Sequence, residues 1–522
     1  MRTQLHHIVA EPAASRGDAP ALTFMDETIT YAGLWQDVAG FGSALERLGL
    51  GRGERVAVYL DKRIETVVVI FGASTAGGVF VPINPLLRSK QVAYILDDCS
   101  VRVLVTSVER LESLRDELEQ CPSIEHVIVL GDPRKPGPAL PCDVVAWDAL
   151  ERSDAVPDHG VIDVDMAAIL YTSGSTGMPK GVVLSHRNLL AGGESVSQYL
   201  ENDADDVILA VLPLSFDAGF SQLSTAFTVG AHVVLVNYLL PRDVVRLCAR
   251  HGVTGLTCVP PLWIQLADED WPPEATASMR YFANTGGRMP RATLDRLRAV
   301  FPNAKPYLMY GLTEAFRSTY LDPAEIDRRP DSIGKAIPNA EVLVVRPDGS
   351  LCDAGEEGEL VHRGALVAMG YWDDPARTAE RFKPAPGHDS AIPSEEIAVW
   401  SGDVAVRDED GFLYFVGRRD EMIKTSGYRV SPTEIEEVVY GTGLVRDAVA
   451  LGIDDPRLGQ RIVLAVSPAN GRELDADVLL SELKQHLPLY MVPNEIVVRN
   501  TLPRSPNDKF DRNRLRQELA SS

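Results

Sequence analysis

The sequence predicts an α/β protein with a separate C-terminal domain, and three observations lead to this. In the first half, β-rich runs such as VAVYL and VRVLVTS (101–107) alternate with helical patterns such as YAGLWQDVAGFGSALERLGL, which suggests a parallel sheet covered on both faces. From about residue 340, short strands with turn signals follow one another, as in AEVLVVRPDGSL and GFLYFVGRRD. Residues 421–522 carry 13 basic and 15 acidic side chains, a net charge of −2, whereas the rest of the chain carries −21.

The composition is that of a soluble globular protein. The 522 residues include 51 Lys+Arg and 74 Asp+Glu, a formal net charge of −23, and 45% are hydrophobic. This apolar content excludes a disordered chain, and the acidic excess argues against nucleic acid as a partner. We find no apolar run long enough to span a membrane and no secretory core at the start. The six separate cysteines indicate a reduced, cytoplasmic protein, and no spacing is typical of a zinc site.

The strongest motif is Tyr171-Thr-Ser-Gly-Ser-Thr-Gly-Met-Pro-Lys-Gly181, which follows the apolar run AAIL. Its glycines permit close backbone approach, its hydroxyls are donors, and Lys180 adds a cation. Such a loop can bind a polyphosphate, although it does not fit the GxxxxGK[ST] pattern. The alternative is a flexible glycine turn, which the density of hydroxyls and the Pro-Lys-Gly ending argue against.

This loop and five further motifs resemble those of the AMP-forming adenylating enzymes, which include acyl-CoA synthetases, adenylation domains of peptide synthetases and luciferases. The further motifs occur in the family's order: Tyr310-Gly-Leu-Thr-Glu314, Ser401-Gly-Asp403, Gly417-Arg-Arg-Asp420, Lys424-Thr-Ser-Gly427-Tyr428 and Pro506-Asn-Asp-Lys509. The resemblance covers nearly the whole chain. It implies a large N-terminal part (1–419) of two α/β subdomains and a small β-barrel-like subdomain. A hinged α+β lid (421–522) follows, with the hinge at Asp420.

The resemblance implies an ATP and Mg²⁺ site. In it Thr313 would bond the α-phosphate, Glu314 would bind magnesium as a hard oxygen donor, and Asp403 would bind the ribose hydroxyls. The residues expected around the nucleotide are Thr172, Ser173, Gly174, Ser175, Thr176, Gly177, Lys180, Gly286, Gly287, Arg288, Tyr310, Gly311, Asp403 and Arg418.

Lys509 is the expected catalytic residue for adenylation. An ammonium placed between the attacking carboxylate and the phosphate relieves the repulsion of two anions. The family commonly has PxxGK, and Asp508 stands here in place of the glycine. For the second half-reaction, the resemblance implies that the lid rotates at Asp420 and that Lys424 and Gly427 then lie on the segment lining the thiol tunnel.

The stretch Leu212-Pro-Leu-Ser-Phe-Asp217 bears on the substrate. Asp217 matches the aspartate that binds the α-ammonium in amino-acid-activating relatives, and a buried carboxylate needs a cationic partner. The alternative is a capping aspartate. The expected pocket residues are Phe216, Asp217, Ala218, Ser221, Cys258, Ala283, Thr285, Met309, Arg317 and Ser318. Most are small or medium, which suits a compact substrate. Arg317 is the exception, and either points outward or binds a substrate oxygen.

The expected function is ATP-dependent adenylation of a small amino acid, followed by transfer to a thiol. Several stretches resemble stand-alone ligases that load L-proline onto a carrier protein, and also acyl-CoA ligases found near exosortase systems. No carrier domain follows Lys509, so the thiol is expected on a separate phosphopantetheinylated carrier protein or on CoA. One alternative is an acyl-CoA ligase for an acid without an amino group. Another is a catalytically silent nucleotide-binding regulator, against which Lys509, Glu314 and Asp403 argue.

Overall fold

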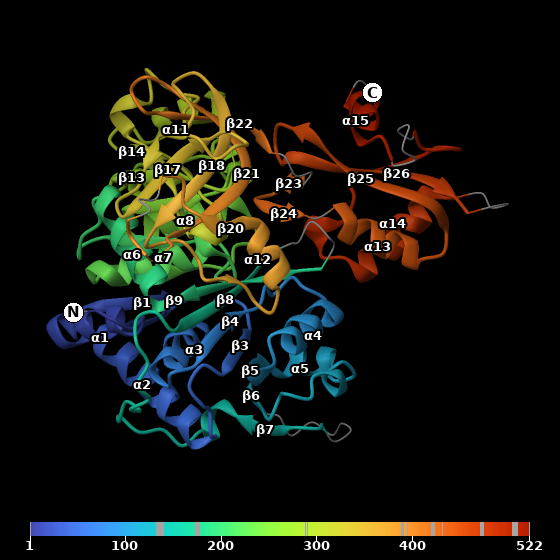
Figure 1. Cartoon of the computed structure of the whole chain (residues 1–522). Helices are drawn as coiled ribbons and strands as arrows, with labels where there is room; N and C mark the ends of the chain where they lie inside the picture. Colours follow the sequence, from blue (N-terminus) through green and yellow to red (C-terminus); the bar gives the residue numbers. More distant parts are fainter. Residues whose placement is uncertain are drawn as a thin grey trace.

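The computed structural model describes residues 2–131, 140–172, 178–287, 289, 291–387, 391–393, 395–418, 423–430, 432–469, 474–503 and 510–520. It has two large sheets, a smaller antiparallel sheet beside them and a C-terminal α+β unit at one side (Figure 1). The expected α/β fold with a small C-terminal domain is therefore confirmed. The proposed boundary at Asp420 lies outside the described residues.

The first large sheet has eight strands in the order β19-β9-β8-β4-β3-β5-β6-β7. They are β3 (Arg55–Tyr59), β4 (Val79–Pro82), β5 (Val101–Ser107), β6 (His126–Leu130), β7 (Asp143–Ala146), β8 (Met166–Thr172), β9 (Lys180–Ser185) and β19 (Gly370–Tyr371). Its helices are α3 (Ile64–Thr75), α4 (Ser89–Asp98) and α5 (Val108–Leu114), with the short 3₁₀ turns η1 (Leu118–Gln120) and η2 (Trp147–Ala149).

The second large sheet has nine strands in the order β16-β15-β14-β13-β12-β10-β11-β1-β2. They are β1 (Pro20–Phe24), β2 (Glu27–Thr30), β10 (Val207–Ala210), β11 (His232–Leu235), β12 (Gly255–Cys258), β13 (Tyr281–Asn284), β14 (Lys305–Tyr310), β15 (Thr319–Leu321) and β16 (Lys335–Ala336). The helices of this part are α1 (His7–Arg16), α2 (Tyr31–Arg47), α6 (His186–Tyr199), α7 (Asp217–Val229), α8 (Pro241–His251), α9 (Pro260–Leu266), α10 (Pro273–Thr276) and α11 (Arg291–Val300), with η3 (Thr313–Ala315) and η4 (Pro323–Glu325).

Both large sheets are mixed, which corrects the expectation of one parallel sheet. β8 and β9 run antiparallel because the connection between them, residues 173–179, is shorter than the roughly dozen residues that a parallel crossover requires. The main core includes helices of both sheets. Phe71 of α3 packs against Phe220 and Phe227 of α7 at ring-centroid distances of 6.3 and 5.5 Å. A helix buried nearly all round, as α3 is, needs apolar residues on every face, and its sequence IETVVVIFGAST provides them.

The small sheet is antiparallel and is the β subdomain expected after residue 340. Its described strands form an open sheet: β17 (Ala340–Val345), β18 (Glu357–Gly364), β20 (Phe382–Pro384), β21 (Ile397–Arg407) and β22 (Leu413–Arg418), with α12 (Pro375–Arg381) beside it. Asp403 of β21 stands opposite Arg418 of β22 in register. This pairing places two residues of separate sequence motifs at one edge of the sheet.

The C-terminal unit is a five-stranded sheet with helices on both faces. Its elements are β23 (Ile423–Thr425), β24 (Tyr428–Val430), α13 (Pro432–Gly441), β25 (Val445–Asp455), β26 (Gly459–Pro468), α14 (Ala476–His486), η5 (Leu489–Met491), β27 (Glu495–Val498) and α15 (Arg512–Ala520). Two hydrogen bonds tie it to the first large sheet: Arg88 Nη2 donates to the Lys484 carbonyl at 3.1 Å and Gln91 Nε2 to Glu434 Oε1 at 2.9 Å. Among the described helices, none is both long and apolar enough to cross a membrane.

Buried histidines predict a loss of stability in acid. Burial lowers the pKa of His362 to about 4, and neither ring nitrogen has a hydrogen-bond partner in the described part of the chain. Between pH 6.5 and 4 the unfolded chain binds a proton at this histidine that the folded chain does not. The free energy of unfolding therefore falls by about 1.4 kcal/mol for each unit by which the pH is lowered in this range. In urea unfolding of His362→Val, we expect the free energy of unfolding to change less with pH than in wild type, by about 1.4 kcal/mol per pH unit between pH 4 and 6.5. Equal slopes for wild type and His362→Val would contradict the assignment.

Candidate active site

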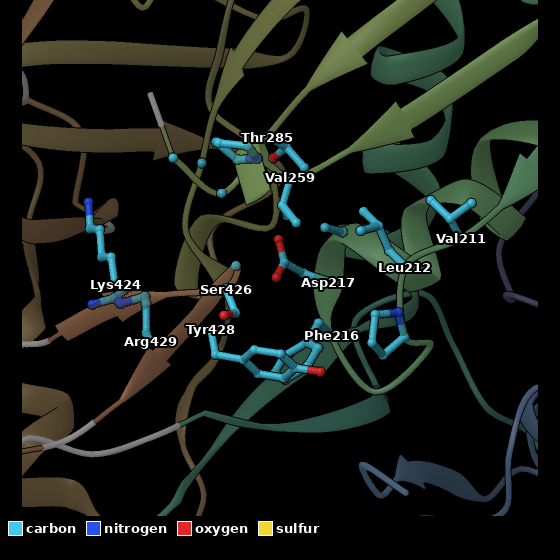
Figure 2. Close-up of a pocket in the computed structure, with 18 of the residues that line it drawn as sticks. Val211, Leu212, Phe216, Asp217, Val259, Thr285, Lys424, Ser426, Tyr428 and Arg429 are labelled. Carbon is cyan, nitrogen blue, oxygen red and sulfur yellow. The ribbon is translucent and has the colours of Figure 1, made fainter. Parts of the chain in front are cut away.

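A pocket of about 870 Å³ opens where the carboxyl ends of strands from both large sheets meet. Its wall includes the residues that follow β3, β4, β10, β12, β13 and β14, together with the β23–β24 hairpin. Ligands of α/β proteins bind at this edge because loops there converge from several strands. The pocket is the candidate active site (Figure 2).

Seven residues expected around the nucleotide line this pocket. They are Thr172, Gly286, Gly287, Tyr310, Gly311, Thr313 and Asp403. Thr172 Oγ1 is buried without a hydrogen-bond partner among the described residues, so it has a donor to offer a ligand. Tyr310 donates its hydroxyl to Asp403 Oδ2 at 2.5 Å, which fixes both side chains at the pocket wall.

Other expected residues cannot be placed. Ser173, Gly174, Ser175, Thr176, Gly177, Arg288, Asp420 and Lys509 lie outside the described residues, and only the backbone of Arg418 is described. Their expected roles remain predictions.

Glu314 is a buried, ionised carboxylate held by two donors. Lys180 Nζ donates to Glu314 Oε1 at 2.9 Å and the Tyr371 hydroxyl donates to the same oxygen at 2.7 Å. Burial raises the pKa of Glu314, but Lys180 and Tyr371 outweigh this and bring it to about 2. Mg²⁺ takes one or two carboxylates and completes its shell with substrate phosphates and water. Glu314 fits that donor set, and in the described part of the chain no three His, Cys, Asp or Glu side chains gather to hold a metal alone.

Asp217 begins helix α7 and points into the pocket (Figure 2). Thr313 Oγ1 donates to Asp217 Oδ1 at 3.2 Å, and Arg317 Nη1 lies 3.8 Å from Asp217 Oδ2. Burial raises the pKa of Asp217, and Arg317 opposes the rise. The sequence left open whether Arg317 points outward. Its side chain is only 4% exposed, so it lies inside the protein.

The expected substrate residues divide between two cavities. Phe216, Asp217, Thr285 and Met309 are among those lining the large pocket. Ala218, Ser221, Met309 and Arg317 also line a second, adjacent cavity of about 20 Å³. Cys258, Ala283 and Ser318 are buried but are not among the described residues lining either cavity. The small size of the second cavity is compatible with a compact substrate.

Sequence reasoning missed Lys62, which is buried in the pocket wall. Its Nζ donates to three backbone carbonyls, those of Ala210, Val211 and Leu212, at 2.7–3.2 Å. These carbonyls satisfy the three donors of an ammonium, so Lys62 holds the segment that leads to Phe216 and Asp217. A lysine two residues after a buried apolar run was the available signal. Tyr371 was also missed, because its partner Glu314 is distant in sequence.

The β23–β24 hairpin covers part of the pocket. Gly427 has a φ of +80°, and a Cβ built on it would lie 2.8 Å from Val259 Cγ2. Tyr428 packs edge-on against Phe216, with ring centroids 5.4 Å apart, and stacks on Tyr490 at 3.8 Å. In this arrangement Lys424 and Gly427 line the pocket together with Gly286, and their place on a thiol tunnel remains a prediction.

Comparison with known proteins places this site in context. The model of the AMP-binding enzyme family matches residues 9–372, and that of the AMP-binding enzyme C-terminal domain matches residues 434–509. The chain is 31% identical over 514 residues to a sulfoacetate–CoA ligase of Cupriavidus necator, covering 97% of this chain and 96% of that protein. It is 29% identical over 530 residues to an L-proline–[L-prolyl-carrier protein] ligase of Pseudomonas fluorescens, covering 99% of each. An amide bond synthetase from Marinactinospora thermotolerans has a similar fold, with a TM-score of 0.87, 24% identity and 99% of both chains covered.

Proposed function

Because the chain belongs to the family of AMP-binding enzymes and is an AMP-forming acid–thiol ligase, we propose that it adenylates a small amino acid and transfers it to the thiol of a separate carrier protein. The observation that carries the amino-acid assignment is Asp217, a buried carboxylate that points into the pocket. A substrate ammonium at Asp217 would supply the close cationic partner that a buried carboxylate needs.

In the proposed reaction, one set of residues would bind ATP and Mg²⁺, and another would bind the substrate acid and the thiol. Asp403 and Tyr310 would hold the ribose side of ATP. Thr313, whose hydroxyl donates to Asp217 Oδ1 in this structure, would turn to donate to the α-phosphate instead. Mg²⁺, when bound at Glu314, would neutralise phosphate charge. Lys180 lies 2.9 Å from Glu314, close enough to reach the same phosphates. Attack of the substrate carboxylate on the α-phosphorus forms the acyl-adenylate and releases pyrophosphate.

The thioester step would use the hairpin side of the pocket. The thiolate attacks the carbonyl of the acyl-adenylate, the C–S bond forms and AMP leaves with the electrons of the C–O bond. Because Gly427 has no side chain, the backbone of the hairpin packs directly against Val259 at the pocket wall. A pantetheine arm would pass along this bare backbone. CoA carries the same arm, so it is the alternative acceptor.

A second candidate function is an acyl-CoA ligase for an acid without an amino group. Arg317 favours it, because that guanidinium already stands 3.8 Å from Asp217 and partly balances its charge. The sulfoacetate–CoA ligase, at 31% identity, also supports it. ATP–pyrophosphate exchange with L-proline, the other amino acids, and small and fatty carboxylates separates the two. Exchange with amino acids alone supports the first candidate, and exchange with acids that lack the amino group supports the second.

Asp217→Ala tests the ammonium assignment. We expect the KM for the amino acid to rise about 100-fold or more, because the buried ammonium would lose its partner, while the KM for ATP changes little. Exchange kinetics at varied concentrations of both substrates measure this. Asp205→Ala, at a side chain that is 95% exposed, is the control. An equal rise in both KM values, or a loss of folded protein only, would show that Asp217 is structural.

A further inference from the structure

Arg317 is a buried cation with few hydrogen-bond partners among the described residues. Its Nη1 donates to Thr285 Oγ1 at 3.1 Å, and the same nitrogen is 3.8 Å from Asp217 Oδ2, beyond hydrogen-bond distance. Its Nε is buried and has no acceptor among the described residues. A guanidinium has five N–H donors, and burying a charge without partners is costly. The arrangement therefore leaves donors for a ligand that enters the pocket.

The backbone before Arg317 is bent to keep this side chain inside. Phe316 is fully buried with a φ of +51° and a ψ of −49°, an outlier conformation for a bulky residue. Its ring lies over Gly192, where an added Cβ would be 2.3 Å from Phe316 Cδ1. Packing of the ring thus holds a strained turn, and such strain is concentrated at functional sites.

The charged groups at the acid end of the pocket include one that can bind an anion. Arg317 is a cation of the wall there, and Asp217 is the carboxylate beside it. Burial lowers the pKa of Lys62 to about 7, so Lys62 is only partly charged at neutral pH. Lys62 is satisfied by backbone carbonyls, which carry no net charge. The described lining has three other carboxylates: Asp61 pairs with Arg110, Asp403 accepts a hydrogen bond from Tyr310, and Asp331 is the third.

We propose that Arg317 binds a second oxyanion of the substrate, a carboxylate or sulfonate on the same small acid whose other carboxylate is adenylated. This rests on the proposed activation of a small acid and narrows its substrate class. If the acid has an amino group at Asp217, it is an acidic amino acid such as L-aspartate, which then ranks above L-proline. If it has none, it is a dicarboxylate or a sulfonated acid. A guanidinium suits either group because it can donate two parallel hydrogen bonds to one oxyanion.

Matched pairs of acids test this with the intact enzyme. We would measure kcat/KM for ATP–pyrophosphate exchange with succinate against butyrate, 3-sulfopropionate against butyrate, and L-aspartate against L-2-aminobutyrate. Wild type should prefer the member with the second anion by about 100-fold or more, since a polar site rejects an analogue that leaves its donors unpaired. Arg317→Met should reduce the ratio of kcat/KM within each pair to a few-fold, and Arg317→Lys should fall between. Arg246→Met, at a side chain that is 73% exposed, should match wild type.

Calorimetric titration of the same acids into the enzyme separates failure of the inference from failure of the proposed function. If succinate, 3-sulfopropionate or L-aspartate binds more tightly than its partner and Arg317→Met removes the difference, the inference stands even if no acid supports exchange. Equal binding within every pair, or binding by none of the acids, would overturn it whatever the exchange assay gives. Because the pairs are compared first in wild type, the inference can be overturned even if an Arg317 variant fails to fold.

Discussion

Replacing Lys509 with alanine should abolish adenylate formation while sparing thioester formation. When the substrate carboxylate attacks the α-phosphorus of ATP, two anions meet and charge builds on the transferring group. The proposed ammonium at Lys509 would lie between them, and losing one such donor costs about 3–4 kcal/mol in the transition state, or about 10²–10³ in rate. ATP–pyrophosphate exchange measures the first step.

The second step needs its own assay. Enzyme supplied with synthetic acyl-adenylate and a thiol acceptor should form thioester at close to the wild-type rate in Lys509→Ala, because the acyl group is then already activated. Lys90→Ala, at an exposed lysine of α4, controls for loss of a surface charge. If both steps fell together in Lys509→Ala, the lysine would serve the fold or the pocket as a whole.

The nucleotide side of the site could be predicted because its residues lie in short, continuous motifs. Tyr310, Gly311 and Thr313 are neighbours in the chain, and the strand β14 delivers all three to the pocket together. Asp403 comes from another motif, and the family resemblance selected it, since an isolated SGD is more often a turn. Tyr310 ends strand β14, whereas Asp403 lies within β21, so a motif can reach the pocket from either position.

The acid side was harder because its arrangement depends on long-range packing. The direction of Arg317 follows from the turn at Phe316, where φ is positive. This turn depends on the space above Gly192, more than 100 residues away in the chain. Lys62 meets Ala210–Leu212 across two sheets. No pattern of spacing reveals such contacts. The mixed direction of β8 and β9 could have been predicted from the short connection between them, but the alternation of strands and helices suggested a parallel sheet.

Replacing Gly427 with valine should impair the thioester step and leave adenylate formation largely intact. The backbone at Gly427 has a φ of +80°, and an added Cβ would meet Val259 Cγ2 at 2.8 Å and Val259 Cγ1 at 3.0 Å. Since Val259 cannot withdraw from the buried end of β12 without disturbing the pocket wall, the hairpin would have to move outward. A displacement of about 1 Å at a reacting site costs about 100-fold in rate. Thioester formation from supplied adenylate measures this loss.

Adenylation should survive this change because the proposed rotation at Asp420 takes the hairpin away from the pocket while Lys509 acts. Gly443→Val is the matched control: Gly443 also has a positive φ, of +65°, but an added Cβ there meets no atom of the described chain within 4 Å. It therefore carries the backbone strain without the close approach. A loss confined to the thioester step in Gly427→Val, and absent in Gly443→Val, assigns the effect to the contact with Val259. Equal losses in the two variants would assign it to strain in the C-terminal unit, and equal losses in both half-reactions would mean that the hairpin stays on the pocket throughout the cycle.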